Sequence, residues 1–177
     1  MMRGIFSFVL VFYSLVVFGQ NNGIPASIAV TEGSKLIAHT YAKGVQVYVC
    51  TQDPKDSSRY TWTLKEPRAQ LYADGSYHRL VGKHYFDTGK NPTWEATDGS
   101  KVSGRKIQQA NSPEKAAIPW LLLQSIATQG SGKFTPVLFI QRIHTKGGMA
   151  PATADKANKG QSVEVAYTAE YLFYGEK

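Results

Sequence analysis

The sequence contains only one cysteine, Cys50, and this scarcity excludes a disulfide within the chain. A chain of 177 residues without disulfides depends on its hydrophobic core, and 42% hydrophobic residues, with 12% aromatic residues overall, are enough to build one. Cys50 ends the alternating stretch 45–50, which is typical of a strand. We therefore interpret it as a half-buried strand residue rather than as a reactive thiol.

Long apolar runs are absent after the first nineteen residues, so the sequence predicts no later membrane-spanning helix. Residues 5–18 are almost entirely apolar, follow the basic Arg3 and precede Gly19, which is the pattern of a secretory signal peptide. We expect residues 1–19 to be removed, Gln20 to begin a soluble mature chain, and the protein to be secreted or periplasmic. An uncleaved N-terminal anchor is the alternative.

Blocks of like charge are also absent. The chain carries 20 Lys and Arg against 13 Asp and Glu, a net charge of +7, but its basic residues are scattered. A scattered excess of this kind does not predict nucleic-acid binding. An exported basic protein is more naturally paired with acidic polysaccharide or envelope material.

The sequence has no P-loop, no G-x-S-x-G elbow, no H-E-x-x-H and no calcium loop. The glycines of residues 130–132 lack the third glycine and the βαβ context of a dinucleotide site, so no cofactor is predicted. Ser112 and Lys115 match S-x-x-K without its companion motifs. These absences exclude the common motif-bearing enzyme classes.

The histidines do not predict a metal site. His78 and His84 are six residues apart, about 20 Å along one straight strand, which is too far for one metal. His84 and His144 on neighbouring strands, with Glu95 or Asp98 as a third ligand, form the only alternative. We interpret His84 and His144 as hydrogen-bonded residues near strand ends instead.

Alternating patterns predict many short strands and very little helix. Residues 163–173 alternate most clearly, and residues 59–65 place Tyr60, Trp62 and Leu64 on one buried face. Residues 92–97 and 101–108 form a hairpin around Asp98-Gly99. The expected strands are 44–51, 59–65, 70–73, 79–86, 92–97, 101–108, 120–127, 134–145 and 163–173. For residues 120–127 a helix starting after Pro119 is the alternative.

Short strands separated by turns predict an all-β fold, an antiparallel β-sandwich or flattened barrel of about eight to ten strands. We expect a signal peptide over residues 1–19, an extended lead-in over 20–39 and a single β-rich domain over 40–177. Residues 146–161 form a long loop, and loops of this length are often functional or mobile.

A candidate ligand site combines aromatic rings with carboxylates and imidazoles, a combination that suits sugars. Trp94 and Tyr85 would stack on the ligand, Glu95 and Asp98 would accept hydrogen bonds, and Arg142 and His144 would donate them. Arg142 is alternatively paired with Glu95 or Asp98, and these side chains are alternatively structural. The candidate residues are His84, Tyr85, Trp94, Glu95, Asp98, Arg142 and His144.

Several motifs occur together in one order. They are G-V-Q-V-Y-V-C at 44–50, V-G-K-H-Y at 81–85, P-T-W-E at 92–95 with D-G-S at 98–100, I-P-W-L-L-L at 118–123, I-Q-R-I-H-T at 140–145 and Y-T-A-E-Y-L-F-Y at 167–174. Over about residues 40–175 the chain resembles a family of secreted bacterial and fungal proteins known as domain of unknown function 3455. The resemblance carries no established chemistry, and nothing here supports the malate-dehydrogenase label of some relatives.

The resemblance also implies a difference at Cys50. Relatives often have a second cysteine that looks like a disulfide partner, where this chain has Thr-Ala-Asp-Lys at 153–156. Cys50 is therefore expected to be unpaired.

Three functions remain open from the sequence. The leading hypothesis is an exported, non-catalytic protein that binds a carbohydrate or a small polar ligand. A hydrolase-type enzyme using His84 or Glu95 as a base is the second, and a structural envelope protein is the third.

Overall fold

A computed structural model describes residues 23–177 of the chain. The predicted signal peptide, residues 1–19, and the predicted first residue of the mature chain, Gln20, lie outside the described residues. In the described part, no helix is both long enough and apolar enough to cross a membrane.

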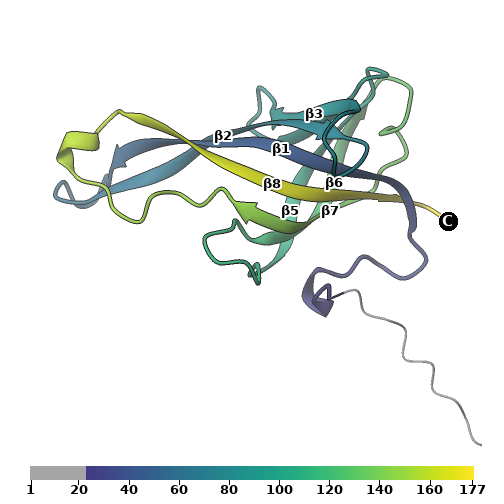
Figure 1. The fold of residues 1–177 in the computed structure, drawn as a ribbon, viewed down its shortest axis with the longest axis horizontal. Coiled ribbons are helices and arrows are strands. Elements are labelled where there is room, and N and C mark those ends of the chain that lie inside the picture. The colour runs from purple at the N-terminus through teal and green to yellow at the C-terminus, as the bar shows by residue number, and fades with distance from the viewer. Residues whose placement is uncertain (1–22) are drawn as a thin grey trace, which may run out of the picture.

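Eight antiparallel strands close into one barrel, in which each strand pairs with its neighbours in sequence and β1 pairs with β8 (Figure 1). The all-β prediction is confirmed, in its barrel form. The strands are β1 (Lys35–Gln52), β2 (Tyr60–Tyr72), β3 (Leu80–Phe86), β4 (Pro92–Ala96), β5 (Lys101–Ala110), β6 (Trp120–Gln129), β7 (Phe139–Gly147) and β8 (Ser162–Gly175). Two 3-10 turns, η1 (Ala26–Ile28) and η2 (Lys156–Asn158), are the only helical segments among residues 23–177.

Most expected strands occur near their predicted positions, and β1, β2 and β7 differ from the prediction in their extent. Residues 120–129 form the strand β6, so the helix alternative is wrong there. The expected strands 59–65 and 70–73 are parts of one long strand, β2, which continues through Pro67. Residues 134–138 precede β7 as a turn, in which Val137 donates its backbone N–H to the Phe134 carbonyl.

The N-terminal lead-in packs against the barrel more closely than the sequence indicated. β1 begins at Lys35, so residues 35–39 belong to the sheet and not to the lead-in. Ile28 of η1 is fully buried against Trp120, Leu122 and Ile143, on the outside of β6 and β7. Gln141 donates its side-chain N–H to the Ile28 carbonyl over 2.6 Å, which fixes the segment there.

The barrel interior combines small residues on some strands with large rings on others, which is how small barrels are filled. Alanines occupy interior positions of β1, β2, β4 and β8, opposite Trp94, Tyr171 and Phe173. Phe134 closes one end of the barrel, where its ring stacks on Phe173 with a centroid distance of 4.4 Å. The other end is open to a pocket described below.

Gly44 is required where β1 and β2 come closest. A Cβ atom at this position would lie 2.1 Å from the Arg68 carbonyl oxygen and 2.5 Å from the Ala69 Cα. Both atoms belong to the backbone, so no side-chain rotation relieves the overlap.

We therefore expect Gly44→Ala to lower the free energy of unfolding by about 1–3 kcal/mol, the usual cost of overpacking a core. Chemical denaturation followed by circular dichroism measures this change. Gly75→Ala is the matched control, because its Cβ would meet nothing closer than 3.6 Å. Equal stability of the two variants would contradict the close approach.

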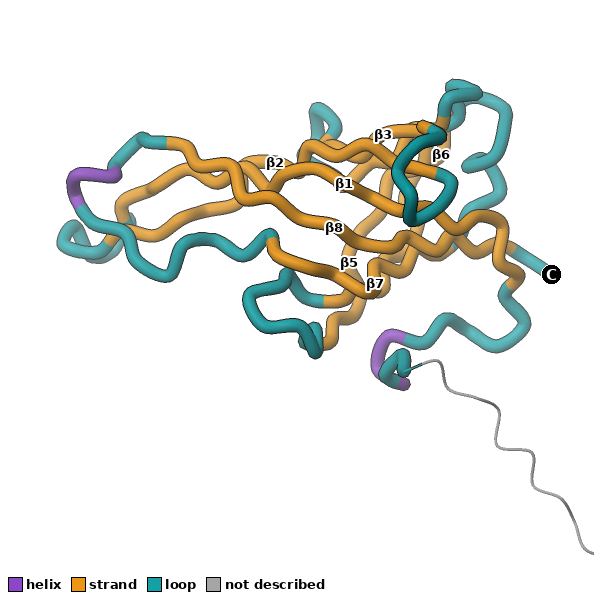
Figure 2. The backbone as a smooth tube through the Cα atoms, viewed as in Figure 1, coloured by secondary structure: helices purple, strands orange, loops and turns teal. Residues whose placement is uncertain are grey.

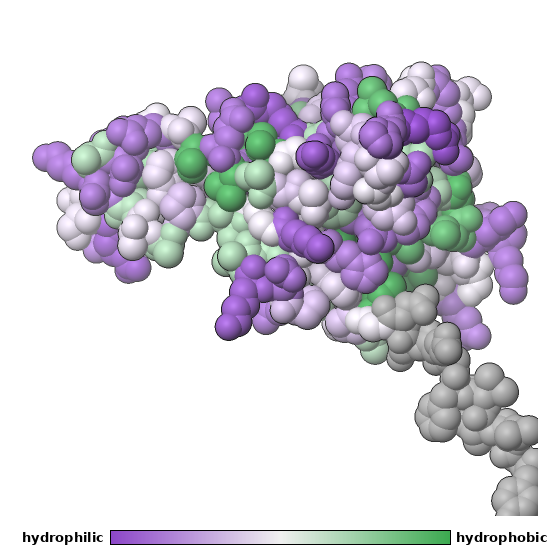
Figure 3. Space-filling view, viewed as in Figure 1, coloured by the Kyte–Doolittle hydropathy of each residue, from purple (hydrophilic) through white to green (hydrophobic). Residues whose placement is uncertain are grey.

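Three strands continue beyond the barrel as a long ribbon, formed by residues 45–52 of β1, 60–66 of β2 and 162–166 of β8 (Figure 2). Among the described residues, these parts of β2 and β8 pair with β1 alone. The tip of the ribbon is mainly polar on the face seen in Figure 3. Leu64 was expected on a buried face but is 41% exposed, because other parts of the chain cover the ribbon only in part.

One face of the ribbon is covered by the loop of residues 148–161. Trp62 donates its indole N–H to the Thr153 carbonyl at 2.9 Å, and the Tyr48 hydroxyl donates to the Gly148 carbonyl at 2.6 Å. Cys50 is buried beneath this loop, with its Sγ 4.0 Å from the Asp155 carbonyl oxygen. Cys50 is free, as the sequence predicts.

Candidate functional site

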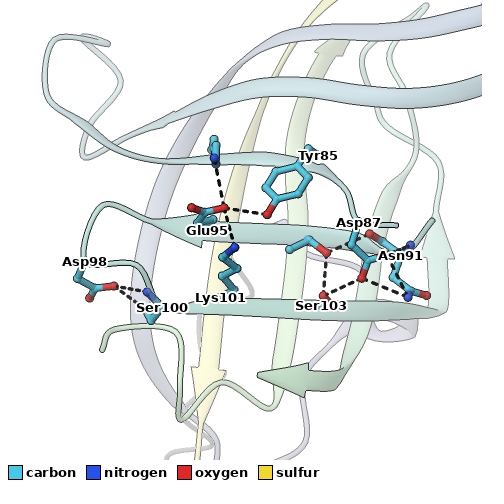
Figure 4. Close-up of polar contacts among 10 residues, drawn as sticks. Tyr85, Asp87, Asn91, Glu95, Asp98, Ser100, Lys101 and Ser103 are labelled. Atoms are coloured by element: carbon cyan, nitrogen blue, oxygen red, sulfur yellow. Dashed lines mark hydrogen bonds and ion pairs between the residues drawn. The ribbon is translucent and has the colours of Figure 1, made fainter. Parts of the chain in front are cut away.

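The strand register separates the candidate residues of β3 and β4. His84 pairs with Trp94, and Lys83 pairs with Glu95. Successive side chains of a strand point to opposite faces, so His84 and Trp94 enter the barrel. Tyr85 and Glu95 lie on its outer face (Figure 4).

A pocket of about 250 Å³ opens at the end of the barrel where the ribbon begins. Trp94, Leu121 and Leu123 contribute to its apolar lining, and Leu64 of the ribbon forms part of its rim. Its polar lining residues are Gln46, His84, Lys106, Gln109, Arg142 and Tyr171. Pockets with apolar walls and a few convergent polar groups are typical of small-molecule sites.

His84 is buried in the pocket wall and is held in one orientation. Its ring stacks on Trp94 with a centroid distance of 4.5 Å and an interplanar angle of 10°. Nδ1 lies 2.9 Å from the Thr93 carbonyl oxygen, so Nδ1 carries the proton and Nε2 keeps its lone pair. Burial, aided by the positive charge of Arg142, lowers the pKa of His84 to about 3, so the ring is neutral at ordinary pH.

Arg142 also faces the interior of the barrel. Its Nε and one terminal nitrogen donate to the Pro119 carbonyl oxygen at 3.1 and 2.8 Å. The expected pairing with Glu95 or Asp98 does not form, because Glu95 lies on the outer face and Asp98 lies in the β4–β5 turn.

Several buried polar atoms around the pocket have no hydrogen-bond partner among the described residues. They are Nε2 of Gln46, Nε1 of Trp94 and the hydroxyl oxygens of Tyr167 and Tyr171. Burial raises the pKa of Tyr171, against an opposing effect of Arg142, so its hydroxyl keeps the proton and can donate it. Buried polar groups are normally satisfied, so a cluster of unsatisfied ones indicates a place for water or a ligand.

Glu95 is the centre of a separate polar cluster on the outer face. Tyr85 donates its hydroxyl to Glu95 at 2.8 Å, and the ammonium groups of Lys83 and Lys101 lie 3.3 and 3.4 Å from the same oxygen (Figure 4). The Tyr85 hydrogen bond is the main reason why the pKa of Glu95 is lowered. A carboxylate stabilised in its charged form is a weak base.

Asp98 has a structural role in the turn between β4 and β5. Its carboxylate accepts hydrogen bonds from the Ser100 hydroxyl at 2.6 Å, the Ser100 backbone N–H at 2.9 Å and the Lys133 backbone N–H at 2.8 Å. These bonds lower the pKa of Asp98 and tie the loop that carries Phe134 to the hairpin.

His144 lies outside the barrel, on the face of β7 and β8. Its Nδ1 is 3.0 Å from one oxygen of Glu170, whose other oxygen is 2.7 Å from Nε2 of His39. The ring of His144 also meets Trp120 edge to face at 5.2 Å. His144 is therefore separated from the pocket, and its backbone φ of 48° marks an irregular point of β7.

The structure brings His84, Trp94 and Arg142 together and leaves Tyr85, Glu95, Asp98 and His144 elsewhere. His84 and Glu95 lie on opposite faces of the sheet, so the two side chains are not positioned to act together on one substrate. Stacking of a sugar on Tyr85 and Trp94 together fails for the same reason, and one face of Trp94 is already covered by His84.

Sequence reasoning missed Gln46 and Tyr171 as pocket residues, and Tyr167 as a buried neighbour of Tyr171. Tyr167 and Tyr171 share the buried face of β8 with Phe173, and this alternation gave a signal for burial but none for a polar function. Gln46 is adjacent to Val45 and Val47 in a typical strand pattern. It reaches the pocket because the barrel closes between β1 and β8, which no local pattern reveals.

No group of three or more His, Cys, Asp and Glu side chains within residues 23–177 is arranged to hold a metal ion. The pocket residues bear one imidazole and no carboxylate, a donor set that does not fit a divalent cation.

A family model described as Protein of unknown function (DUF3455) matches residues 31–175. The resemblance expected from the ordered motifs is confirmed by this match. Searches among curated proteins and among solved structures gave no match.

Proposed function

The chain belongs to the DUF3455 family of proteins of unknown function, and we propose that it is an exported, non-catalytic protein that binds a small polar ligand at the open end of its barrel. The export part of this proposal rests on the pattern of residues 1–19. The binding part rests on the pocket.

One observation carries the proposal. Three residues that line the pocket beside its apolar walls, Gln46, Trp94 and Tyr171, each have a buried polar atom without a hydrogen-bond partner among the described residues. Each buried polar group that lacks a hydrogen-bond partner costs about 1–3 kcal/mol. A ligand that forms hydrogen bonds with these groups would offset that cost, so their grouping in one pocket supports ligand binding there.

A role without catalysis follows from the chemistry of the same residues. Among the described residues, no carboxylate or nucleophilic hydroxyl is hydrogen-bonded to the neutral His84. Its Nδ1–H donates to the Thr93 carbonyl oxygen. General acid–base catalysis requires a group with a pKa near the working pH. A pKa of about 3 places the His84 imidazole far from that range.

Thermal unfolding of residues 20–177 with a panel of sugars, sugar acids and organic acids tests the proposal. A ligand at about one hundred times its dissociation constant adds roughly 2.7 kcal/mol to stability and raises the melting temperature by roughly 5–10 °C. We expect Leu64→Trp, which fills the rim of the pocket, to remove the shift.

Ile126→Trp is the matched control, since Ile126 is similarly exposed on β6 and does not line the pocket. A shift that survives Leu64→Trp would place the ligand elsewhere on the molecule. No shift with any compound would favour the structural envelope role instead.

A further inference from the structure

The charge of the pocket is of one sign. Arg142 and Lys106 line it, and none of its other lining residues is acidic. Arg142 forms no ion pair with any described carboxylate. A partly buried guanidinium without a counter-charge is costly in a folded protein, because its desolvation is not offset.

Arg142 also has donors to spare. The guanidinium carries five N–H groups. Its Nε and one terminal nitrogen donate to the Pro119 carbonyl oxygen, and Tyr171 lies near enough for Arg142 to lower its pKa. The double contact with Pro119 fixes the plane of the guanidinium and leaves its remaining N–H groups for another partner. Planar, fixed guanidinium groups are suited to carboxylates, which accept two parallel hydrogen bonds.

The other unpartnered atoms of the pocket are also donors. Gln46 offers its side-chain N–H₂, Trp94 its indole N–H and Tyr171 its hydroxyl. Arg142 lies close enough to Tyr171 to lower its pKa, the Trp94 ring is 5.3 Å from the Tyr171 ring, and Gln46 lines the same pocket. An excess of donors that includes a guanidinium favours a ligand with a negatively charged group that only accepts hydrogen bonds, such as a carboxylate.

We propose that the pocket binds a small carboxylate with an apolar body, whose carboxylate is held by Arg142 with help from Gln46 and Tyr171. The apolar part lies against Leu121 and Leu123. The inference rests on the proposed binding function and names its ligand class. A pocket of about 250 Å³ admits a compound of the size of benzoate or hexanoate.

Isothermal titration of the full mature chain with benzoate, hexanoate and the neutral benzamide tests the ligand class. We expect both carboxylates to bind and benzamide, which has the same ring without the charge, to bind at least tenfold more weakly. Inorganic phosphate is a fourth probe, and it separates recognition of a carboxylate with an apolar body from recognition of any anion. Phosphate binding as tight as benzoate binding would overturn the apolar part of the proposal.

Arg142→Gln should weaken benzoate binding by about 10- to 100-fold, which is the usual worth of a charge-assisted hydrogen bond, and leave benzamide binding unchanged. Arg142→Lys keeps the positive charge but lacks the planar guanidinium. It provides a second test of the role of Arg142 if the Gln variant does not fold. It should weaken benzoate less. Arg68→Gln is the matched control, because Arg68 is an exposed arginine paired with Glu164 away from the pocket.

The outcomes distinguish the two proposals. Equal binding of benzamide and benzoate, abolished by Leu64→Trp, would retain the binding site and reject the anionic ligand. Benzoate binding that is unaffected by both Arg142 variants would reject the role of Arg142. Absence of binding by all four probes would overturn the carboxylate proposal. If a sugar nevertheless bound, and Leu64→Trp abolished its binding, the pocket would still be supported as the ligand site.

Discussion

Replacing Trp94 with alanine is expected to lower the free energy of unfolding by about 3–5 kcal/mol, the usual cost of truncating a large buried aromatic residue. Trp94 is 1% exposed and lies at the centre of the interior cluster. Its ring stacks on His84 and meets Tyr171 and Phe173 edge to face at 5.3 and 6.1 Å. The surrounding strands are closed into a barrel and cannot collapse into the space, so most of the cavity would remain.

Urea denaturation followed by circular dichroism measures this loss. Trp62→Ala is the matched control, because Trp62 lies on the thin ribbon and keeps only part of its surface buried. We expect it to cost less than half as much. A loss below about 1.5 kcal/mol for Trp94→Ala, within the range of ordinary single substitutions, would show that Trp94 is not the core of the fold.

The second large effect is a loss of stability in mild acid. The folded pKa of His84, about 3, is below its ordinary value of 6.5, because burial disfavours the charged ring. Between these two values the unfolded chain binds a proton that the folded chain does not. Stability therefore falls as the pH falls through this window, by about 1.4 kcal/mol per pH unit.

The measurement is the free energy of unfolding between pH 6.5 and 4.5. The pKa values of Glu95, Asp98 and Asp87 are lowered in the folded chain, so their contributions are lost at lower pH and do not mask this range. His84→Asn can still donate to the Thr93 carbonyl without titrating, and it should flatten the curve. His78→Asn, at an exposed loop position, should leave the slope unchanged. A flat curve in the unmodified protein would contradict the burial of a neutral His84.

The fold class could be predicted from the sequence because alternation and turn signals are local. The alternation of residues 163–173 placed Tyr167, Ala169, Tyr171 and Phe173 on one face, and the structure buries these four. Gln141 and Arg142 on β7 point to opposite faces of the sheet for the same reason. The Asp98-Gly99 turn occurs as expected, with Gly99 at a φ of 86°.

The candidate site could be predicted only in part, because a site depends on register and closure. Period-two alternation separates His84 from Tyr85 and Trp94 from Glu95, but it does not say which member of each pair faces inward. His84 and Trp94 stack inside the barrel because of the β3–β4 register. Gln46 lies at the pocket because the barrel closes between β1 and β8. Residues close in sequence were therefore grouped into one site that the sheet divides between two faces.

The ribbon could not be predicted for a similar reason. Residues 60–65 have the alternating composition of a strand with one buried face, and a buried face needs a second layer. Only the path of residues 148–161 decides where that layer exists, and this loop has no periodic pattern. The exposure of Leu64 at the pocket rim is a consequence of this path.

Closure of the barrel between its first and last strands also sets the order in which the protein can fold. Lys35 is opposite Gly175, and β1 is bonded to β8 along most of its length. Contacts that join the two ends of a chain form slowly, because the long intervening loop must be closed first. Until β8 is in place, β1 and β7 present unpaired edges of the kind that pair with other chains. The 14 residues of β8 are therefore what separates a closed barrel from an open sheet with two unpaired edges.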